Sequence, residues 1–264
     1  MPPDAISCAI KANIQQKLLE IERQENVCIF YACESGSRAW GFPSADSDYD
    51  VRFIYIHPRD WYLSIEGQRD VIERPLTGDI DLSGWEIRKA LRLFRKSNPP
   101  LLEWLRSSII YQEKFSVADK LRGLMPTFYS PRNCFHHYLH MAEGNFREYL
   151  RGETVRVKKY FYVLRPLLGC RWIEAGLGSV PMEFSTLVER VAPIEILKEE
   201  IYSLLKRKQS GQELDFEPRI PAISDFIESE LERLKKQADQ QPLSPKQGDQ
   251  LDGLFREALV EVWK

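Results

Sequence analysis

Short apolar runs separated by polar turns dominate the first part of the chain. Ahead of them, apolar residues recur every three or four positions over 5–24, which predicts an amphipathic helix. Strands are expected at 27–33, 48–56, 71–76, 79–82 and 109–112, and short helices at 83–96 and 101–106. The helix at 83–96 is expected to begin at Ser83, because Glu86 follows three residues later as in a capping box. Residues 1–115 are therefore predicted to form a small mixed α/β unit.

Long helical periodicity replaces this pattern in the rest of the chain. Ser130 precedes Pro131, and proline is favoured at the first position of a helix. Helices are predicted at 130–150, 155–175, 184–191, 194–208, 220–237 and 248–262. We therefore expect an α/β (α+β) protein, in which a mixed sheet with helices is followed by an all-helical domain at 116–264.

The composition is that of a globular protein, with 43% hydrophobic and 29% charged residues in a chain of 264. The net charge of −2 argues against a uniformly basic nucleic-acid coat, although it allows a local basic patch. The five cysteines are scattered without a Cys-x-x-Cys pair, so we expect reduced packing residues in a cytoplasmic protein. No apolar run approaches the roughly 20 residues needed to span a bilayer, so no membrane association is expected.

The candidate chemistry lies between the first two predicted strands. Gly36 and Ser37 form a turn there; glycine lets the backbone approach a ligand closely, and exposed turn amides bind phosphate. Asp48 and Asp50 start the next strand two residues apart, which places both carboxylates on one face. Adjacent carboxylates repel each other unless a cation neutralises them, and Mg²⁺ prefers carboxylates together with substrate phosphate oxygens. A polar turn before a strand is the alternative, but the preceding Gly-Ser turn favours a metal-nucleotide site.

Gly36-Ser37, followed after ten residues by Asp48-Tyr49-Asp50, resembles the signature of the polymerase-beta-type nucleotidyltransferase superfamily. Four further stretches resemble the predicted nucleotidyltransferases associated with RNA ligase and RNA repair. They are Asp81-Leu82-Ser83-Gly84-Trp85, Lys96-Ser97-Asn98-Pro99, Leu102-Glu103-Trp104-Leu105 and the run from Lys158 to Pro166. The resemblance covers about 36–184, and the residues after 184 add little to it. It implies a polymerase-beta-like sheet, with the helical domain closing the nucleotide cleft.

The resemblance also implies an activity. The enzyme would depend on Mg²⁺ or Mn²⁺, move a nucleoside monophosphate from an NTP to an acceptor hydroxyl, and release pyrophosphate. Nucleotidyl transfer usually uses two metal ions, and in this superfamily a third carboxylate on a later strand joins Asp48 and Asp50. We assign that role to Asp81, with Asp79 as the alternative, and a helix-capping role is the competing interpretation of Asp81. An RNA end is the implied acceptor, and an RNA ligase system is an expected partner.

Two groups of residues are expected to bind the nucleotide. In the first, Ser37 contacts the β or γ phosphate through its hydroxyl and amide, and Arg38 adds charge. The second belongs to the matching motif of the resembled family: Lys158, Lys159, Tyr162 and Arg165. The spacings of four and three residues place all of these except Lys159 on one helix face, where they would clamp the triphosphate and base. A solvated surface stripe is the alternative.

Three arginines form a basic stripe on the helix that follows the third carboxylate: Arg88, Arg92 and Arg95. They would suit RNA phosphates, although a charged outer helix face is the commoner explanation and is slightly preferred. Two other functions stay open. A nucleotidyltransferase acting on a protein or small molecule, such as an adenylylating antitoxin, fits the lack of a large basic surface. A catalytically silent nucleotide-binding module is the third possibility, and the intact carboxylates argue against it.

Overall fold

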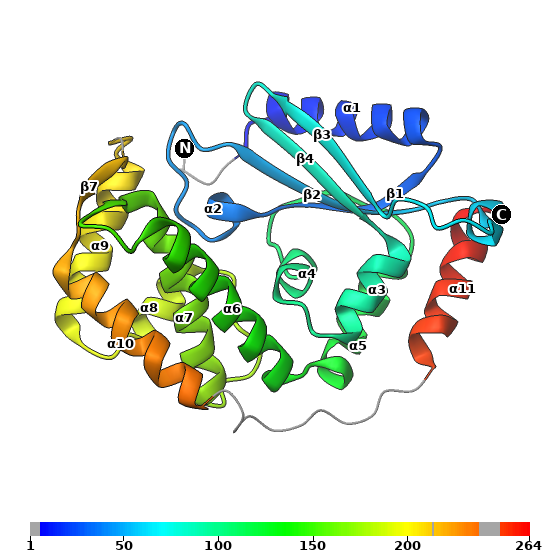
Figure 1. Cartoon of the computed structure of the whole chain (residues 1–264). Helices are drawn as coiled ribbons and strands as arrows, with labels where there is room; N and C mark the ends of the chain where they lie inside the picture. Colours follow the sequence, from blue (N-terminus) through cyan, green and yellow to red (C-terminus); the bar gives the residue numbers. More distant parts are fainter. Residues whose placement is uncertain (1–5, 213, 238–248) are drawn as a thin grey trace. The chain divides into compact units, whose positions relative to one another are not determined.

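The computed structural model describes residues 6–212, 214–237 and 249–264, which divide into two compact units (Figure 1). Unit 1 comprises the described residues within Met1–Ala39, Ser47–Tyr129 and Pro245–Lys264. Unit 2 comprises those within Trp40–Asp46 and Ser130–Ser244. The division therefore differs from the expected boundary at residue 115. No helix within the described ranges combines the length and apolarity that crossing a bilayer requires.

The sheet of unit 1 has five strands in the order β3-β4-β2-β1-β5. The strands are β1 (Cys28–Glu34), β2 (Tyr49–Ile56), β3 (Val71–Thr77), β4 (Ile80–Glu86) and β5 (Ile110–Glu113). Three of the four pairings are antiparallel, and β2 pairs with β4 in parallel. The expected mixed sheet is therefore confirmed. The parallel pairing matters most for function, because it brings the starts of β2 and β4 to the same edge.

Helices cover both faces of this sheet. They are α1 (Cys8–Glu25), α3 (Ile87–Arg95), α4 (Pro99–Trp104), α5 (Val117–Phe128) and α11 (Gln250–Val262), with the single turns α2 (Gly36–Ala39) and η1 (Arg59–Leu63). Figure 1 shows α1 on one face and α3, α4 and α5 on the other. The buried face of α1, with Ile14, Leu18 and Ile21, packs on strand residues such as Phe53 and Leu82. The predicted amphipathic helix therefore closes one half of the core.

Helix α3 begins later than the capping-box pattern predicted. Residues 80–86 alternate between buried and half-buried positions, so the strand continues to Glu86. Position 84 of this strand is a glycine because the ring of Phe53 fills the space that a side chain would need, with its Cε2 atom 2.1 Å from an ideal Cβ. Glu86 caps α3 by accepting hydrogen bonds from the amides of Arg88 (2.8 Å) and Lys89 (3.4 Å). Asp81 therefore lies inside a strand and has no helix-capping role.

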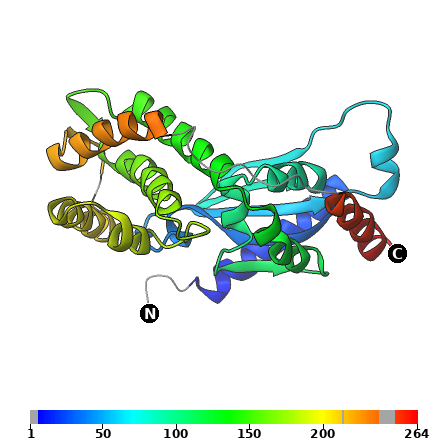
Figure 2. The ribbon, with the colours of Figure 1, turned by 90° about the horizontal axis from the view of Figure 1, so that it is seen from below.

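Two helices outside residues 1–115 belong to unit 1. Helix α5 was not expected from the sequence, and Phe128 packs against Phe94 of α3 with ring centroids 5.4 Å apart. The sequence pattern places α11 in the helical domain, but both views show it beside α3 (Figure 2). Glu261 of α11 accepts hydrogen bonds from the amide (2.9 Å) and hydroxyl (2.7 Å) of Ser116. These contacts explain why the boundary falls after residue 129.

Unit 2 is built around one buried helix, α7 (Tyr160–Glu174). Its other helices are α6 (Pro131–Tyr149), α8 (Phe184–Val191), α9 (Glu195–Gln209) and α10 (Pro221–Gln237). The region is not entirely helical, because β6 (Thr154–Arg156) pairs with β7 (Phe216–Pro218) and leads into the turn η2 (Val157–Lys159). The segment 40–46 belongs to this unit because Phe42 packs against the rings of Phe161 (5.0 Å) and Phe184 (5.4 Å).

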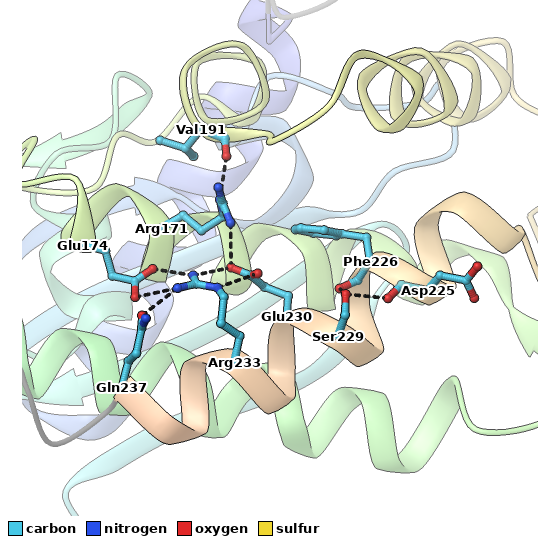
Figure 3. Close-up of polar contacts among 9 residues, drawn as sticks. All are labelled: Arg171, Glu174, Val191, Asp225, Phe226, Ser229, Glu230, Arg233 and Gln237. Atoms are coloured by element: carbon cyan, nitrogen blue, oxygen red, sulfur yellow. Dashed lines mark hydrogen bonds and ion pairs between the residues drawn. The ribbon is translucent and has the colours of Figure 1, made fainter.

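A charged network ties three helices of unit 2 together (Figure 3). Glu230 of α10, which is 4% exposed, accepts hydrogen bonds from Arg171 of α7 (3.1 Å) and from Arg233 (2.6 and 2.9 Å). Arg233 also reaches Glu174 of α7 (2.6 and 3.1 Å), and Arg171 donates to the carbonyl of Val191 in α8 (2.8 Å). Burial raises the pKa of Glu230, but the Arg233 hydrogen bonds and the Arg171 charge outweigh it, so the pKa lies below its usual value.

We predict that Glu230→Gln lowers the free energy of unfolding at pH 7 by about 1–3 kcal/mol, because an amide cannot satisfy two guanidinium groups. Since the folded pKa is depressed, the stability from the carboxylate is present above the unfolded pKa of about 4.3 and is lost as pH falls through the folded value. The difference between parent and variant should therefore shrink below about pH 4. Urea unfolding from pH 3 to 8 measures it. The control is Glu228→Gln, an exposed partner of Arg219 on the same helix. Equal losses in both variants would contradict the prediction.

Candidate active site

The predicted carboxylates lie at the edge of the sheet where β2 and β4 begin. The parallel register places Asp50 of β2 directly opposite Asp81 of β4. Asp48 is exposed and lies one residue before β2. Asp79 is exposed in the turn before β4, where its carbonyl accepts a hydrogen bond from the amide of Tyr49 (2.6 Å). The tertiary structure therefore makes Asp81, and not Asp79, the strand neighbour of Asp50.

The guanidinium of Arg52 lies between the two facing carboxylates. Its Nη2 atom is 2.8 Å from Asp50 Oδ1 and 2.8 Å from Asp81 Oδ2. Its Nη1 atom donates to the carbonyls of Val51 (3.2 Å) and Asp81 (3.3 Å). No sequence motif indicates Arg52, although it stands two residues after Asp50 and so shares its face of the strand. Part of the expected carboxylate repulsion is thus neutralised by the protein itself.

A buried carboxylate holds the main chain of Asp50 in place. Glu34, at the end of β1, is fully buried and accepts hydrogen bonds from the amide of Asp50 (3.1 Å) and the hydroxyl of Tyr111. Burial raises the pKa of Glu34 to about 7, against the opposing effect of these two hydrogen bonds. The amide of Ser35 donates to the carbonyl of Asp50 (2.9 Å). The end of β1 therefore holds Asp50 through both its amide and its carbonyl.

Gly36 leaves the room that the Asp50 carboxylate occupies. Its φ of +60° is a left-handed conformation, and a Cβ built on it would lie 2.0 Å from Asp50 Oδ2. The sequence suggested this glycine for close approach of a phosphate, and the structure adds a steric reason that comes from the protein. Ser37 follows in the turn α2, where its hydroxyl contacts that of Ser47 (3.4 Å).

Arg38, which is expected to add charge at the phosphates, is buried. Its side chain is 8% exposed, and Nη2 donates to the carbonyl of Ser47 (2.9 Å). The guanidinium lies over the ring of Tyr49 at 4.2 Å, and Nε is 3.7 Å from Glu34 Oε1. These contacts anchor the chain where it returns to β2. A role in binding phosphate has no support from this inward placement.

The predicted nucleotide contacts after residue 157 all belong to unit 2. Lys158 is exposed but lies in η2, ahead of the α-helix, so the expected helix face does not include it. Lys159 is partly buried, which lowers its pKa, and its ammonium lies over the rings of Tyr149 (4.3 Å) and Tyr162 (4.8 Å). Nucleotide contacts by Lys158, Lys159 and Tyr162 stay predictions.

Arg165 is a core residue, contrary to the prediction that it faces a nucleotide. It is 2% exposed and donates to the carbonyls of Pro181 (3.2 Å) and Met182 (3.3 Å). Its guanidinium also lies over the ring of Trp40 at 4.7 Å. The reason is that other parts of unit 2 surround α7 on nearly every side, so helical spacing alone could not identify an open face.

The donor chemistry of this edge suits a hard divalent cation. Asp48, Asp50 and Asp81 supply carboxylate oxygens, the ligands that Mg²⁺ and Mn²⁺ prefer. Within the described ranges, however, no three His, Cys, Asp or Glu side chains are already arranged to hold a metal ion. Instead, the guanidinium of Arg52 lies between Asp50 and Asp81. The residues therefore fit a metal, provided that the guanidinium moves.

Comparisons with known proteins identify the family of this chain. The sequence model of RlaP, the RNA repair pathway DNA polymerase beta family, matches residues 10–257. The uncharacterized protein YcgL of Bacillus subtilis (strain 168) is 50% identical over 256 residues, covering 97% of this chain and 98% of that protein. A crystal structure of a nucleotidyltransferase-like protein from Exiguobacterium sibiricum 255-15 covers 94% of this chain and 88% of its own, with 15% identity and a TM-score of 0.33. The family match confirms the resemblance and extends it well beyond residue 184.

We predict that Gly36→Ala destabilises the protein more than Gly78→Ala does. Both glycines have nearly the same backbone conformation, with φ of +60° and +62°, so both alanines add similar strain of about 1–2 kcal/mol. Only at Gly36 does the new Cβ meet a side chain, and displacing Asp50 should cost about 1–3 kcal/mol more. Urea unfolding of both variants measures the difference. Equal destabilisation would show that the carboxylate does not depend on this space.

Proposed function

Because the chain belongs to the RNA repair pathway DNA polymerase beta family, we propose that it transfers a nucleoside monophosphate from an NTP to an acceptor hydroxyl, with release of pyrophosphate. The family and the mixed sheet are those of nucleotidyltransferases. The observation that carries the proposal is the in-register pair Asp50 and Asp81, beside the Gly36 turn. This edge combines oxygen donors for a cation with a turn suited to phosphate.

Each residue of the edge has a proposed task. Asp48, Asp50 and Asp81 would hold Mg²⁺ or Mn²⁺, two ions by analogy with other nucleotidyl transfer sites. When bound, such cations supply charge neutralisation of the triphosphate and activation of the acceptor hydroxyl. Glu34 keeps the backbone of Asp50 in place through its amide. Ser37, on the turn that adjoins Asp50, is proposed to orient a phosphate oxygen through its hydroxyl.

We propose an RNA end as the acceptor, supported by the family description and by a groove in unit 1. The groove, of about 250 Å³, lies between α3 and α11 and includes Arg92, Arg95 and Phe255 in its lining. Arg92 and Arg95 are exposed and can contact phosphates. Arg88 differs from them, because its guanidinium lies over the ring of Tyr62 at 4.7 Å and beside Glu86. The proposed phosphate-binding stripe is therefore shorter than the sequence suggested.

Two competing functions each have one supporting observation. A nucleotidyltransferase acting on a protein or small molecule is favoured by the net charge of −2, which provides little general attraction for RNA. A silent nucleotide-binding module is favoured by Arg52, whose guanidinium pairs with both Asp50 and Asp81. These functions differ from the proposed one in which molecule, RNA, protein or neither, carries the label after incubation with an α-labelled NTP.

We predict that Asp50→Asn and Asp81→Asn each reduce transfer of an α-labelled NMP by about 100-fold or more, because each removes a metal ligand. Asp79→Asn is the matched control, an exposed carboxylate two residues before Asp81, and should keep parental activity. The assay uses each NTP with Mg²⁺ and a panel of RNA and protein acceptors, and circular dichroism checks folding. Label on protein alone would support the first competing function. NTP binding without any transfer by the parent would support the silent module.

A further prediction concerns RNA binding in the groove between α3 and α11. If Arg92 and Arg95 each contact one phosphate of a single-stranded RNA, changing both to glutamine should make the slope of log affinity against log salt shallower. The expected change is roughly 1.4, at about 0.7 for each phosphate contact. Fluorescence anisotropy with a short single-stranded RNA measures the slope. The control is the double variant Arg23→Gln with Arg69→Gln, which changes two exposed arginines outside the groove. If both double variants bind RNA with the parental slope, α3 presents only a solvated charged face.

A further inference from the structure

We propose that Arg52 is a built-in counter-cation that a metal must displace before it can bind between Asp50 and Asp81, and that Arg52 thereby sets the metal affinity of the site. This inference rests on the proposed function, because it concerns the same carboxylates. It starts from one atom, Arg52 Nη2, which is 2.8 Å from an oxygen of each carboxylate. A single nitrogen thus joins the two strands at the point where a shared cation would join them.

Arg52 and a metal ion compete for these oxygens. Mg²⁺ binds carboxylate oxygen at about 2.0–2.1 Å, with little tolerance in its geometry. A guanidinium nitrogen hydrogen-bonded to the same two oxygens fills the space between them, and its charge repels the ion. Arg52 cannot be released by losing a proton, because arginine stays charged in proteins. A cation can therefore bridge Asp50 and Asp81 only when the side chain swings away.

The remaining contacts of Arg52 show what displacement costs. Nη1 donates to the carbonyls of Val51 (3.2 Å) and Asp81 (3.3 Å), so both ends of the guanidinium fork are held. The side chain is 19% exposed, whereas those of Asp50 and Asp81 are 28% and 40% exposed. The head is thus partly shielded, and its hydrogen bonds to charged groups are stronger than neutral ones. A free cation must break these hydrogen bonds of Arg52, and it brings no group that could accept new ones from the guanidinium.

A metal-bound nucleotide changes this balance. The triphosphate brings anionic oxygens, and a guanidinium binds phosphate as well as it binds carboxylate. A displaced Arg52 can then exchange its carboxylate partners for phosphate oxygens. We therefore expect the metal to bind more tightly with nucleotide than alone, and the difference to depend on Arg52. The carboxylates would face a cation in both states, which reduces the repulsion expected from the sequence.

The test measures Mn²⁺ affinity directly, by electron paramagnetic resonance on the full chain without nucleotide. Arg52→Met removes the charge and keeps an unbranched side chain, so we expect the Mn²⁺ dissociation constant to fall at least tenfold. Arg52→Lys keeps the charge but loses the fork, and an intermediate affinity is expected. Arg69→Met, which removes an arginine that is 72% exposed and paired with Glu73, should bind like the parent. Without metal, Arg52→Met should have a lower melting temperature than the parent, and added Mn²⁺ should raise that melting temperature back toward the parental value.

Three outcomes separate the inference from the function on which it rests. If Asp50→Asn abolishes Mn²⁺ binding but Arg52→Met binds no more tightly than the parent, Arg52 is not a competitor and only the inference fails. If no variant binds Mn²⁺, both the inference and the proposed metal-dependent function are overturned. Should Arg52→Met prove unfolded, Arg52→Lys decides: an affinity equal to or weaker than that of the parent rejects the proposal.

Discussion

Parallel pairing of β2 with β4 is the constraint on which the candidate site depends. In a parallel pair both strands begin at the same edge, so the residues at their starts become neighbours. An antiparallel arrangement would place the start of β4 at the far end of β2. The chain reaches the parallel arrangement by running through η1 and β3 before β4, which forms a hairpin with β3. Asp50 and Asp81, 31 positions apart in the sequence, meet only for this reason.

Around this pairing, charges compensate one another in two layers. At the surface of the edge, Arg52 pairs with both facing carboxylates and offsets part of their charge. Beneath it, the carboxylate of Glu34 is removed from water, and its pKa rises to about 7 despite hydrogen bonds from Tyr111 and from the amide of Asp50. Buried charges destabilise a protein unless partners satisfy them. The edge thus combines an arginine shared by two carboxylates with a buried acid whose pKa is raised.

Unit 2 uses arginine for a different purpose. Arg165 and Arg171 both lie on α7, and both donate to main-chain carbonyls of the same unit. Arg233 is fully occupied by carboxylates and an amide of α7 and α10. These side chains bind neighbouring helices through planar forks that suit carbonyl and carboxylate groups. An arginine at helical spacing is therefore weak evidence for a phosphate site until its burial is known.

The sequence by itself determined the local features of this protein. Periodicity identified most helices and strands, the spacing of Asp48 and Asp50 placed them at one strand start, and the Gly36 motif indicated the family. Only the tertiary structure decided that Asp81 and not Asp79 faces Asp50, that Arg52 lies between the carboxylates, and that α5 and α11 complete unit 1. The reason is physical. Periodicity reports on neighbours two to four residues apart, whereas strand register and burial depend on contacts between segments that are distant in the chain.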